Sequence, residues 1–221
     1  MTARTRLLTK RLMTASMLVV ALAGCRTRGE LVVDEGVGVT AVRGACPAVG
    51  IPDYTGDVTL FTTPGATDSG SLDVTAAMTN LRSSCNDSGA RVYSASTFDV
   101  LARRSDTRGA RTVQLPYFVT VLRGGSAVVS KRVGTVTLNF ADGAERAQAS
   151  AQAGAFIDRA EATLPEDIRR QIIRKRRAGD NDAAIDPLTR PEIKAAVARA
   201  TFEVLVGFQL DAGQLSYNAT R

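Results

Sequence analysis

The feature that most constrains the fold of this chain is a pair of alternating segments joined by two glycines. "TVQLPYFVTVLR" (112–123) and "SAVVSKRVGTVTLNF" (126–140) are rich in β-branched residues, and apolar side chains recur at every second position. A period of two is typical of strands with one face on a core. Gly124-Gly125 suits the positive φ angles of a tight hairpin turn. Pro116 has no backbone N–H to donate, so we expect it at an edge position or a bulge.

Five further segments carry a strand signal. Residues 57–63 are short and β-branched, and residues 71–85 alternate through leucine, valine, alanine and methionine. Alternation returns in 91–104 and, most clearly, in "TFEVLVGFQL" (201–210). The segment "RAQASAQAGAFI" (146–157) is ambiguous, because its alanines favour a helix by propensity but alternate with polar residues. We interpret it as a strand.

Two helices are expected between the last two strands, within residues 165–200. The stretches 163–166 and 189–192 both read T-x-P-E, in which a threonine caps, a proline occupies the first turn and a glutamate reaches back. We expect the first helix to end near Arg177 and the second near Ala200. Seven strands with this insertion predict a mainly β fold, an immunoglobulin-like or fibronectin-like β-sandwich of about seven strands. A closed barrel is the alternative.

We therefore expect one β-sandwich domain over residues 46–211, followed by a C-terminal tail at 212–221. Residues 25–45 mix glycine, charge and valine, and we interpret them as a tether with one short strand at Leu31–Val33.

The first 24 residues have the order of an export signal. Four basic residues and no acidic one accompany an apolar stretch from Leu12 to Ala23. That stretch is shorter than the roughly 20 residues needed to span a bilayer. Leu22-Ala23-Gly24-Cys25 resembles the lipobox of bacterial lipoproteins. The resemblance implies cleavage after Gly24, a diacylglyceryl group on the Cys25 thiol and acylation of the new amine. An ordinary cleavable signal and a single-span anchor are the alternatives.

Lipidation of Cys25 would place the protein in the bacterial cell envelope. By analogy with enterobacterial lipoproteins, Arg26 in place of aspartate permits export to the outer membrane, facing the periplasm; the inner membrane is the alternative. An oxidising periplasm favours disulfides, so we expect Cys46 and Cys85 to pair. A hairpin of 57–63 with 71–85 would return Cys85 towards Cys46. Two free buried thiols are the alternative.

Composition excludes several classes of function. The chain contains no histidine, which removes Ser-His triads and most zinc and iron sites. Its 28 Lys and Arg residues against 22 Asp and Glu residues give a net charge of +6. Without the four basic residues of the export signal, 24 basic residues remain against 22 acidic ones. Nucleic acid is therefore not an expected partner, and no cofactor or metal is expected. Asp180, Asp182 and Asp186 lack the glycine and glutamate of an EF-hand, so we interpret their segment as a solvated loop.

The most suggestive local feature is the basic run "RRQIIRKRR" (169–177). It could contact anionic lipid headgroups, lipopolysaccharide phosphates or an acidic partner; an exposed helix face with cations near its C-terminal end is the alternative. The candidate contact residues are Arg169, Arg170, Arg174, Lys175, Arg176 and Arg177.

Four stretches carry a resemblance to a group of proteins. "CPAVGI" (46–51), "LPYFVTV" (115–121), "KRVGTVTLNF" (131–140) and above all "FEVLVGFQLDAGQLSYN" (202–218) resemble uncharacterised lipoproteins of alphaproteobacteria. In that group the last strand follows the preceding one more directly, so residues 165–200 are expected to be an insertion. The resemblance supports a lipoprotein, the Cys46–Cys85 pair and a strand at 146–157, and it implies no activity.

The sequence thus leaves two hypotheses from different classes. The first is a non-enzymatic, lipid-anchored envelope protein that docks onto another envelope component. The second is a carboxylate-dependent enzyme or small-ligand carrier at the membrane surface, which predicts a pocket lined by two or more acids or an apolar cavity within the sandwich.

Overall fold

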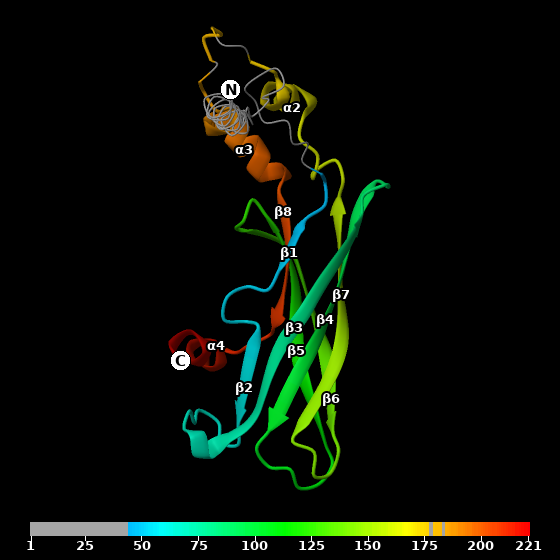
Figure 1. The fold of residues 1–221 in the computed structure, drawn as a ribbon, viewed down its shortest axis with the longest axis vertical. Helices are drawn as coiled ribbons and strands as arrows, with labels where there is room; N and C mark the ends of the chain where they lie inside the picture. The colour runs from blue at the N-terminus through cyan, green and yellow to red at the C-terminus, as the bar shows by residue number, and fades with distance from the viewer. Residues whose placement is uncertain (1–43, 177–178, 183) are drawn as a thin grey trace, which may run out of the picture.

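The structure, a computed structural model, describes residues 44–176, 179–182 and 184–221. It contains two packed β-sheets of four strands each, a pair of helices beyond one end of the sheets and a C-terminal helix (Figure 1). The predicted mainly β sandwich is confirmed. The elements in chain order are β1 (Ala48–Gly50), β2 (Asp57–Phe61), η2 (Ser69–Ser71), β3 (Leu72–Asn86), β4 (Arg91–Arg104), β5 (Arg111–Arg123), β6 (Ala127–Phe140), β7 (Arg146–Asp158), α2 (Glu166–Ile173), η3 (Pro187–Thr189), α3 (Pro191–Ala200), β8 (Phe202–Phe208) and α4 (Ala212–Thr220).

The order of the strands differs from that of an immunoglobulin-like sandwich and excludes a closed barrel. One sheet has the order β2-β3-β4-β7 and the other β1-β8-β5-β6, with β1 parallel to β8. The edge strands β6 and β7 belong to different sheets, so the sheets do not join into a closed barrel there. The order also differs from the ABED and CFG sheets of an immunoglobulin domain, because β4, which follows β2 and β3 in the chain, stays beside β3 instead of crossing to the opposite sheet.

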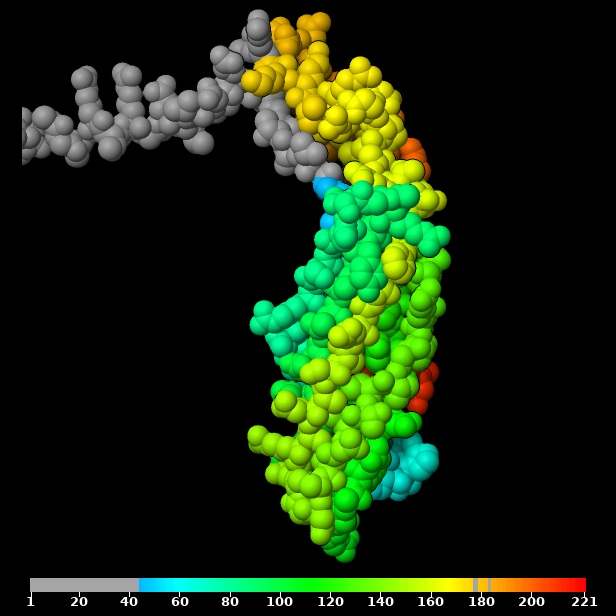
Figure 2. All heavy atoms as spheres, turned by 90° about the vertical axis from the view of Figure 1, so that its right-hand side faces the viewer, coloured from blue at the N-terminus to red at the C-terminus, as the bar shows by residue number. Residues whose placement is uncertain are grey.

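The core lies between the two sheets and is filled by valines and phenylalanines. Phe98 and Val100 of β4 face Val121 of β5, Leu138 of β6 and Val206 of β8 across it, and each of the five is at most 2% exposed. The strands are long: the 14 residues of β4, at about 3.3 Å per residue, span about 45 Å. The molecule is accordingly elongated, with the helical pair beyond one end (Figures 1 and 2).

The central hairpin follows the sequence prediction except at its proline. β5 pairs antiparallel with β6, and Gly124 and Gly125 turn between them at φ angles of 63° and 78°. The edge position expected for Pro116 is wrong, since β5 lies between β8 and β6. The Pro116 carbonyl accepts a bond from the Gln209 N–H, on the β8 side. The position of its missing N–H faces the same side, past Phe208, where β8 has already ended. The proline therefore removes no hydrogen bond from the pairing of β5 with β8.

The ambiguous alanine-rich segment is a strand, as predicted. All 13 residues of β7 pair in register with β4. Ala153, Ala155 and Ile157 of β7 are buried against the core. Here the polar-apolar alternation outweighed the helix propensity of alanine, because tertiary packing rewards a half-buried strand.

The helical insertion is confirmed, but its predicted caps are wrong. Pro191 occupies the first turn of α3, which makes Arg190 the N-cap, and the Thr189 hydroxyl donates instead to the Asp186 carbonyl. In α2 the N-cap is Pro165, and the Thr163 hydroxyl donates to the Arg159 carbonyl. The proline is the first helical residue in α3 and the N-cap in α2, so in both T-x-P-E stretches the threonine stands too far upstream to cap.

The expected C-terminal tail is helix α4, which packs beside β2 (Figure 1). Asp211 and Gln214 form a capping box that starts the helix. The Asn218 amide donates 2.8 Å bonds to the carbonyls of Tyr54 and Asp57. Tyr54 has a φ of 64°, so α4 holds the turn that leads into β2.

Candidate functional site

A disulfide ties the beginning of the described chain to the end of β3. Cys46 and Cys85 are bonded, with their Cα atoms 6.0 Å apart. The predicted pairing is confirmed, and it arises as expected, because β3 pairs antiparallel with β2 and then continues past it towards Cys46. Cys25 and most of the predicted tether, including the strand expected at Leu31–Val33, lie outside the described residues.

The helical lobe, defined as residues 159–201, lies at this same end of the sandwich (Figure 1). A cavity of about 290 Å³ separates it from the start of the described chain and is lined by Gly44 and Cys46 on one side and by Leu164 and Val197 on the other. Arg123 at the end of β5 donates to the Arg199 carbonyl at 2.7 Å, which fastens the lobe to the sheet.

The basic run does not form one continuous face. α2 ends at Ile173 and not near Arg177. Arg169 pairs with Glu166 on α2, while Arg170, Arg174 and Lys175 are exposed. Arg176 is only 3% exposed and is therefore not accessible to a membrane or partner. Arg177 lies outside the described residues.

Asp182 explains why the helix stops early. Its carboxylate lies 2.5 Å from Arg174 Nη2, 3.2 Å from Arg190 Nη2 and 3.8 Å from Arg176 Nε. Residues two apart point in the same direction in an extended segment but to opposite sides of a helix. Arg174 has ψ 121°, and the non-helical backbone lets Arg174 and Arg176 approach the same carboxylate.

The charge of Asp182 is held by these arginines. Burial raises the pKa of Asp182, but the hydrogen bond and charge of Arg174 and the charge of Arg176 outweigh it, so the pKa lies below its ordinary value. The predicted solvated loop therefore contains a structural anion. The signal that could have revealed it is the excess of arginine on both sides of one short acidic loop.

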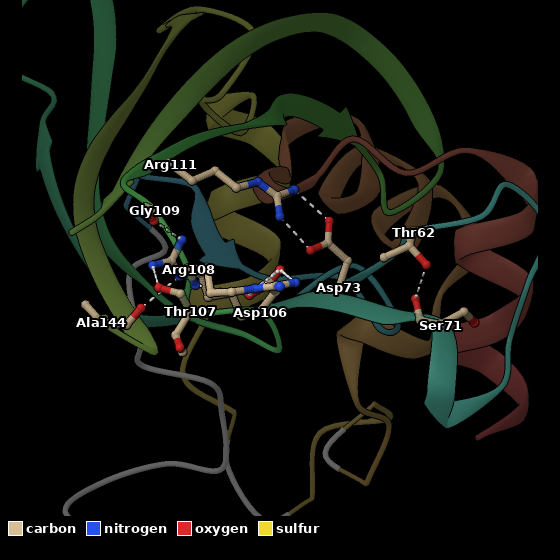
Figure 3. Close-up of polar contacts among 10 residues, drawn as sticks. Thr62, Ser71, Asp73, Asp106, Thr107, Arg108, Gly109, Arg111 and Ala144 are labelled. Atoms are coloured by element: carbon tan, nitrogen blue, oxygen red, sulfur yellow. Dashed lines mark hydrogen bonds and ion pairs between the residues drawn. The ribbon is translucent and has the colours of Figure 1, made fainter. Parts of the chain in front are cut away.

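At the opposite end of the sandwich, Arg104 joins the β4–β5 loop to the β6–β7 loop, a role that the sequence analysis missed. The Arg104 side chain is 1% exposed. It donates to four backbone carbonyls at 2.7–2.8 Å: those of Thr107, Gly109, Ala141 and Ala144. Three of these residues are labelled in Figure 3, on the loops that surround this end. Position 104 has the same parity as the buried residues of β4, which was the available signal.

Ion pairs complete this loop end. Arg111 of β5 and Asp73 of β3 point toward each other in Figure 3 and make two parallel bonds of 2.6 Å across the two sheets. The pairing raises the pKa of Arg111. Asp106 accepts from the Arg108 side chain and backbone, which hold its pKa far below the usual range. The charged groups here are paired with one another and organise the loops.

Two open surface grooves contain acids that are already engaged. A groove of about 390 Å³ beside Tyr217 is lined by Asp73 and Asp211. Asp73 is bound by Arg111, and Asp211 caps α4. A groove of about 620 Å³ on the outer face of β2, β3, β4 and β7 contains one acid, Asp57, which pairs with Arg221 at 3.1 Å. These arrangements offer no adjacent pair of unengaged carboxylates for acid-base chemistry.

No protein-family model, no curated protein and no solved structure matches this chain at a significant level. Within the part of the chain that the structure describes, no three potential metal ligands of the histidine, cysteine and carboxylate types are grouped. No helix among the described residues has the length and apolar character needed to cross a bilayer.

Proposed function

We propose that this protein is a lipid-anchored periplasmic component of the bacterial cell envelope, held in the outer membrane through Cys25, and that it acts as a non-enzymatic interaction module. The observation that carries the proposal is the Cys46–Cys85 disulfide. It suits an oxidising compartment, and of the three cysteines in the chain it leaves Cys25 alone as the thiol for lipidation.

The arrangement of the ends supports an anchoring role. The described chain begins beside the helical lobe, so the tether that would lead from Cys25 enters at that end. Arg170, Arg174 and Lys175 are exposed on the lobe. Each cation near an anionic lipid surface contributes about 1 kcal/mol of attraction. We include Arg170 and Lys175 in the proposed membrane contact and leave out Arg174, whose charge is compensated by Asp182, and the buried Arg176.

An interaction module is favoured over a carboxylate-dependent enzyme or ligand carrier by the state of the acidic groups. Asp73, Asp182 and Asp211 serve as ion-pair or capping partners. Their removal would weaken the fold before it could affect chemistry.

The test is metabolic labelling with a clickable palmitate analogue, followed by membrane fractionation. We expect the wild-type chain to be labelled and sedimented with membranes, and Cys25→Ala to lose both properties. Cys85→Ser is the matched control, since it removes another cysteine and should keep the label. Equal labelling of the wild type and Cys25→Ala, or an unlabelled wild type, would refute lipid anchoring.

A further inference from the structure

The first half of β6 is an uncovered sheet edge. β6 is the last strand of its sheet, and its first seven residues are all exposed. Within them Val128 is 64% exposed, Val129 53% and Val133 60%. The second half differs, because Val136 and Leu138 are buried in the core. An exposed edge presents unpaired N–H and C=O groups along its length, ready to accept another strand.

Gly134 marks the boundary between the two halves. A Cβ on Gly134 would lie 2.5 Å from the Tyr117 ring, so the ring occupies the place of a side chain on the inner face. The Tyr117 hydroxyl then donates at 2.7 Å to the Gln152 carbonyl of β7, in the facing sheet. Residues 127–133 extend beyond this link, and both of their faces are open.

The edges of β2, β1 and β7 are covered, short or interrupted, and the part of β3 that extends past β2 is tied at Cys85 to the start of the described chain. The β2 edge is covered by α4, whose Tyr217 ring packs 5.3 Å from that of Phe61. β1 has three residues. On β7, the Gln152 carbonyl is taken by Tyr117. The strand edge at 127–133 is thus the one to which a partner strand has the longest unobstructed access among these.

Two adjacent cations give this edge a charge preference. Lys131 lies over the Phe118 ring at 5.3 Å, and Arg132 stands opposite the core residue Val119. Neighbouring strand residues point to opposite faces, so one cation flanks the edge on each side. Within residues 44–176, 179–182 and 184–221, neither has an ion-pair partner.

The same charges disfavour a second copy as the occupant. A twofold antiparallel pairing centred on Lys131 or Arg132 would set like cations of two molecules directly opposite each other, and one centred on Ser130 would leave them diagonal neighbours. Like charges on neighbouring strands are destabilising. Lysine on an edge strand is known to oppose such self-pairing. The segment that complements the two cations is therefore an acidic one.

We infer that residues 127–133 of β6 are a docking edge that accepts an extended, acidic segment of another protein as an added strand. Main-chain bonds supply the pairing, the valines supply apolar contact, and carboxylates on both faces of the added segment meet Lys131 and Arg132. The inference deepens the proposed interaction function by assigning its surface and partner class.

The first test uses the full chain purified in a neutral detergent and a fluorescein-labelled peptide. The peptide has two adjacent glutamates at its centre, flanked by alternating valine and threonine, and its binding is followed by anisotropy. We expect Lys131→Glu/Arg132→Glu to weaken binding at least tenfold, and a peptide with two lysines to bind that variant. Arg146→Glu is the matched control, since Arg146 is an exposed β7 cation; it should leave binding unchanged.

A second test needs no variant of the protein. A peptide strand pairs through one of its two edges, so N-methylation of alternate residues should reduce binding at least tenfold in one register and leave it unchanged in the other. Equal binding of both N-methylated peptides, or of the acidic peptide to the wild type and the double variant, would overturn the inference. So would an absence of binding, or dimerisation that the double variant abolishes, which would assign the edge to a second copy. None of these readouts involves the lipid, so they are independent of palmitate labelling.

Discussion

Arg104→Met should destabilise the protein far more than Arg103→Met, although the two residues are neighbours in β4. The buried Arg104 guanidinium is the shared donor for four backbone carbonyls and also lies 5.2 Å from the Phe140 ring. A buried polar group left without a partner costs about 1–3 kcal/mol. These costs are not additive, because water can reach part of the loop end. We expect a loss of about 4 kcal/mol, equal to about two such costs at the middle of that range.

Arg103 provides the matched control. Its side chain is 66% exposed and pairs with Glu145, and exposed ion pairs contribute at most about 1 kcal/mol. Urea unfolding of both variants, in a Cys25→Ala background, measures the difference. With an m-value of about 2 kcal/mol per molar urea, the Arg104 variant should unfold about 2 M earlier than the wild type and the Arg103 variant within about 0.5 M of it. Equal midpoints for the two variants would refute the role assigned to Arg104.

Three further predictions concern other links in the structure. Replacing Cys46 and Cys85 by serine opens a loop with a sequence separation of 39, which in the chain-entropy model removes about 4 kcal/mol of stability; a loss below about 1 kcal/mol in urea unfolding would contradict this. Tyr117→Phe should cost about 1 kcal/mol and Gly134→Ala about 1–3 kcal/mol. Their double-mutant cycle should be non-additive, because displacement of the ring already breaks its hydrogen bond; additive values would argue against the link. The folded pKa of Asp182 is lowered, so its stabilisation is present above the ordinary aspartate pKa, about 4, and is lost as the pH falls below it. Amide exchange in the helical lobe, corrected for intrinsic rates, should therefore accelerate as the pH falls below about 4. In Asp182→Asn the exchange should already be fast at pH 7 and should change little when the pH is lowered.

Local patterns were sufficient for most strands. β5, β6 and β8 alternate, and the paired glycines specify a positive-φ turn, so each is encoded within a dozen residues. β7 could be predicted for the same reason. The short β1 was missed, because three residues carry no period and its pairing with β8 depends on a segment about 150 positions away.

Caps and charged residues were harder to predict, because their roles depend on distant partners. Thr163 and Thr189 look like caps, but the position of each proline assigns the cap to another residue. The tail after Asp211 contains a capping box that was readable in principle. Its packing on β2 depends on carbonyls at Tyr54 and Asp57, which only the folded chain brings to Asn218.

The sequence by itself was enough to predict that this chain alternates as strands, inserts two helices before the last strand and pairs Cys46 with Cys85. The strands and helices follow from patterns within short segments, and the bridge follows from the number of cysteines. Only the tertiary structure decided which backbone carbonyls Arg104 binds, that Asp182 draws Arg176 inside the helical lobe, and that one half of β6 stays uncovered. The physical reason is that burial of a charge or exposure of an edge depends on whether distant segments supply partners, and a one-dimensional pattern contains no such information.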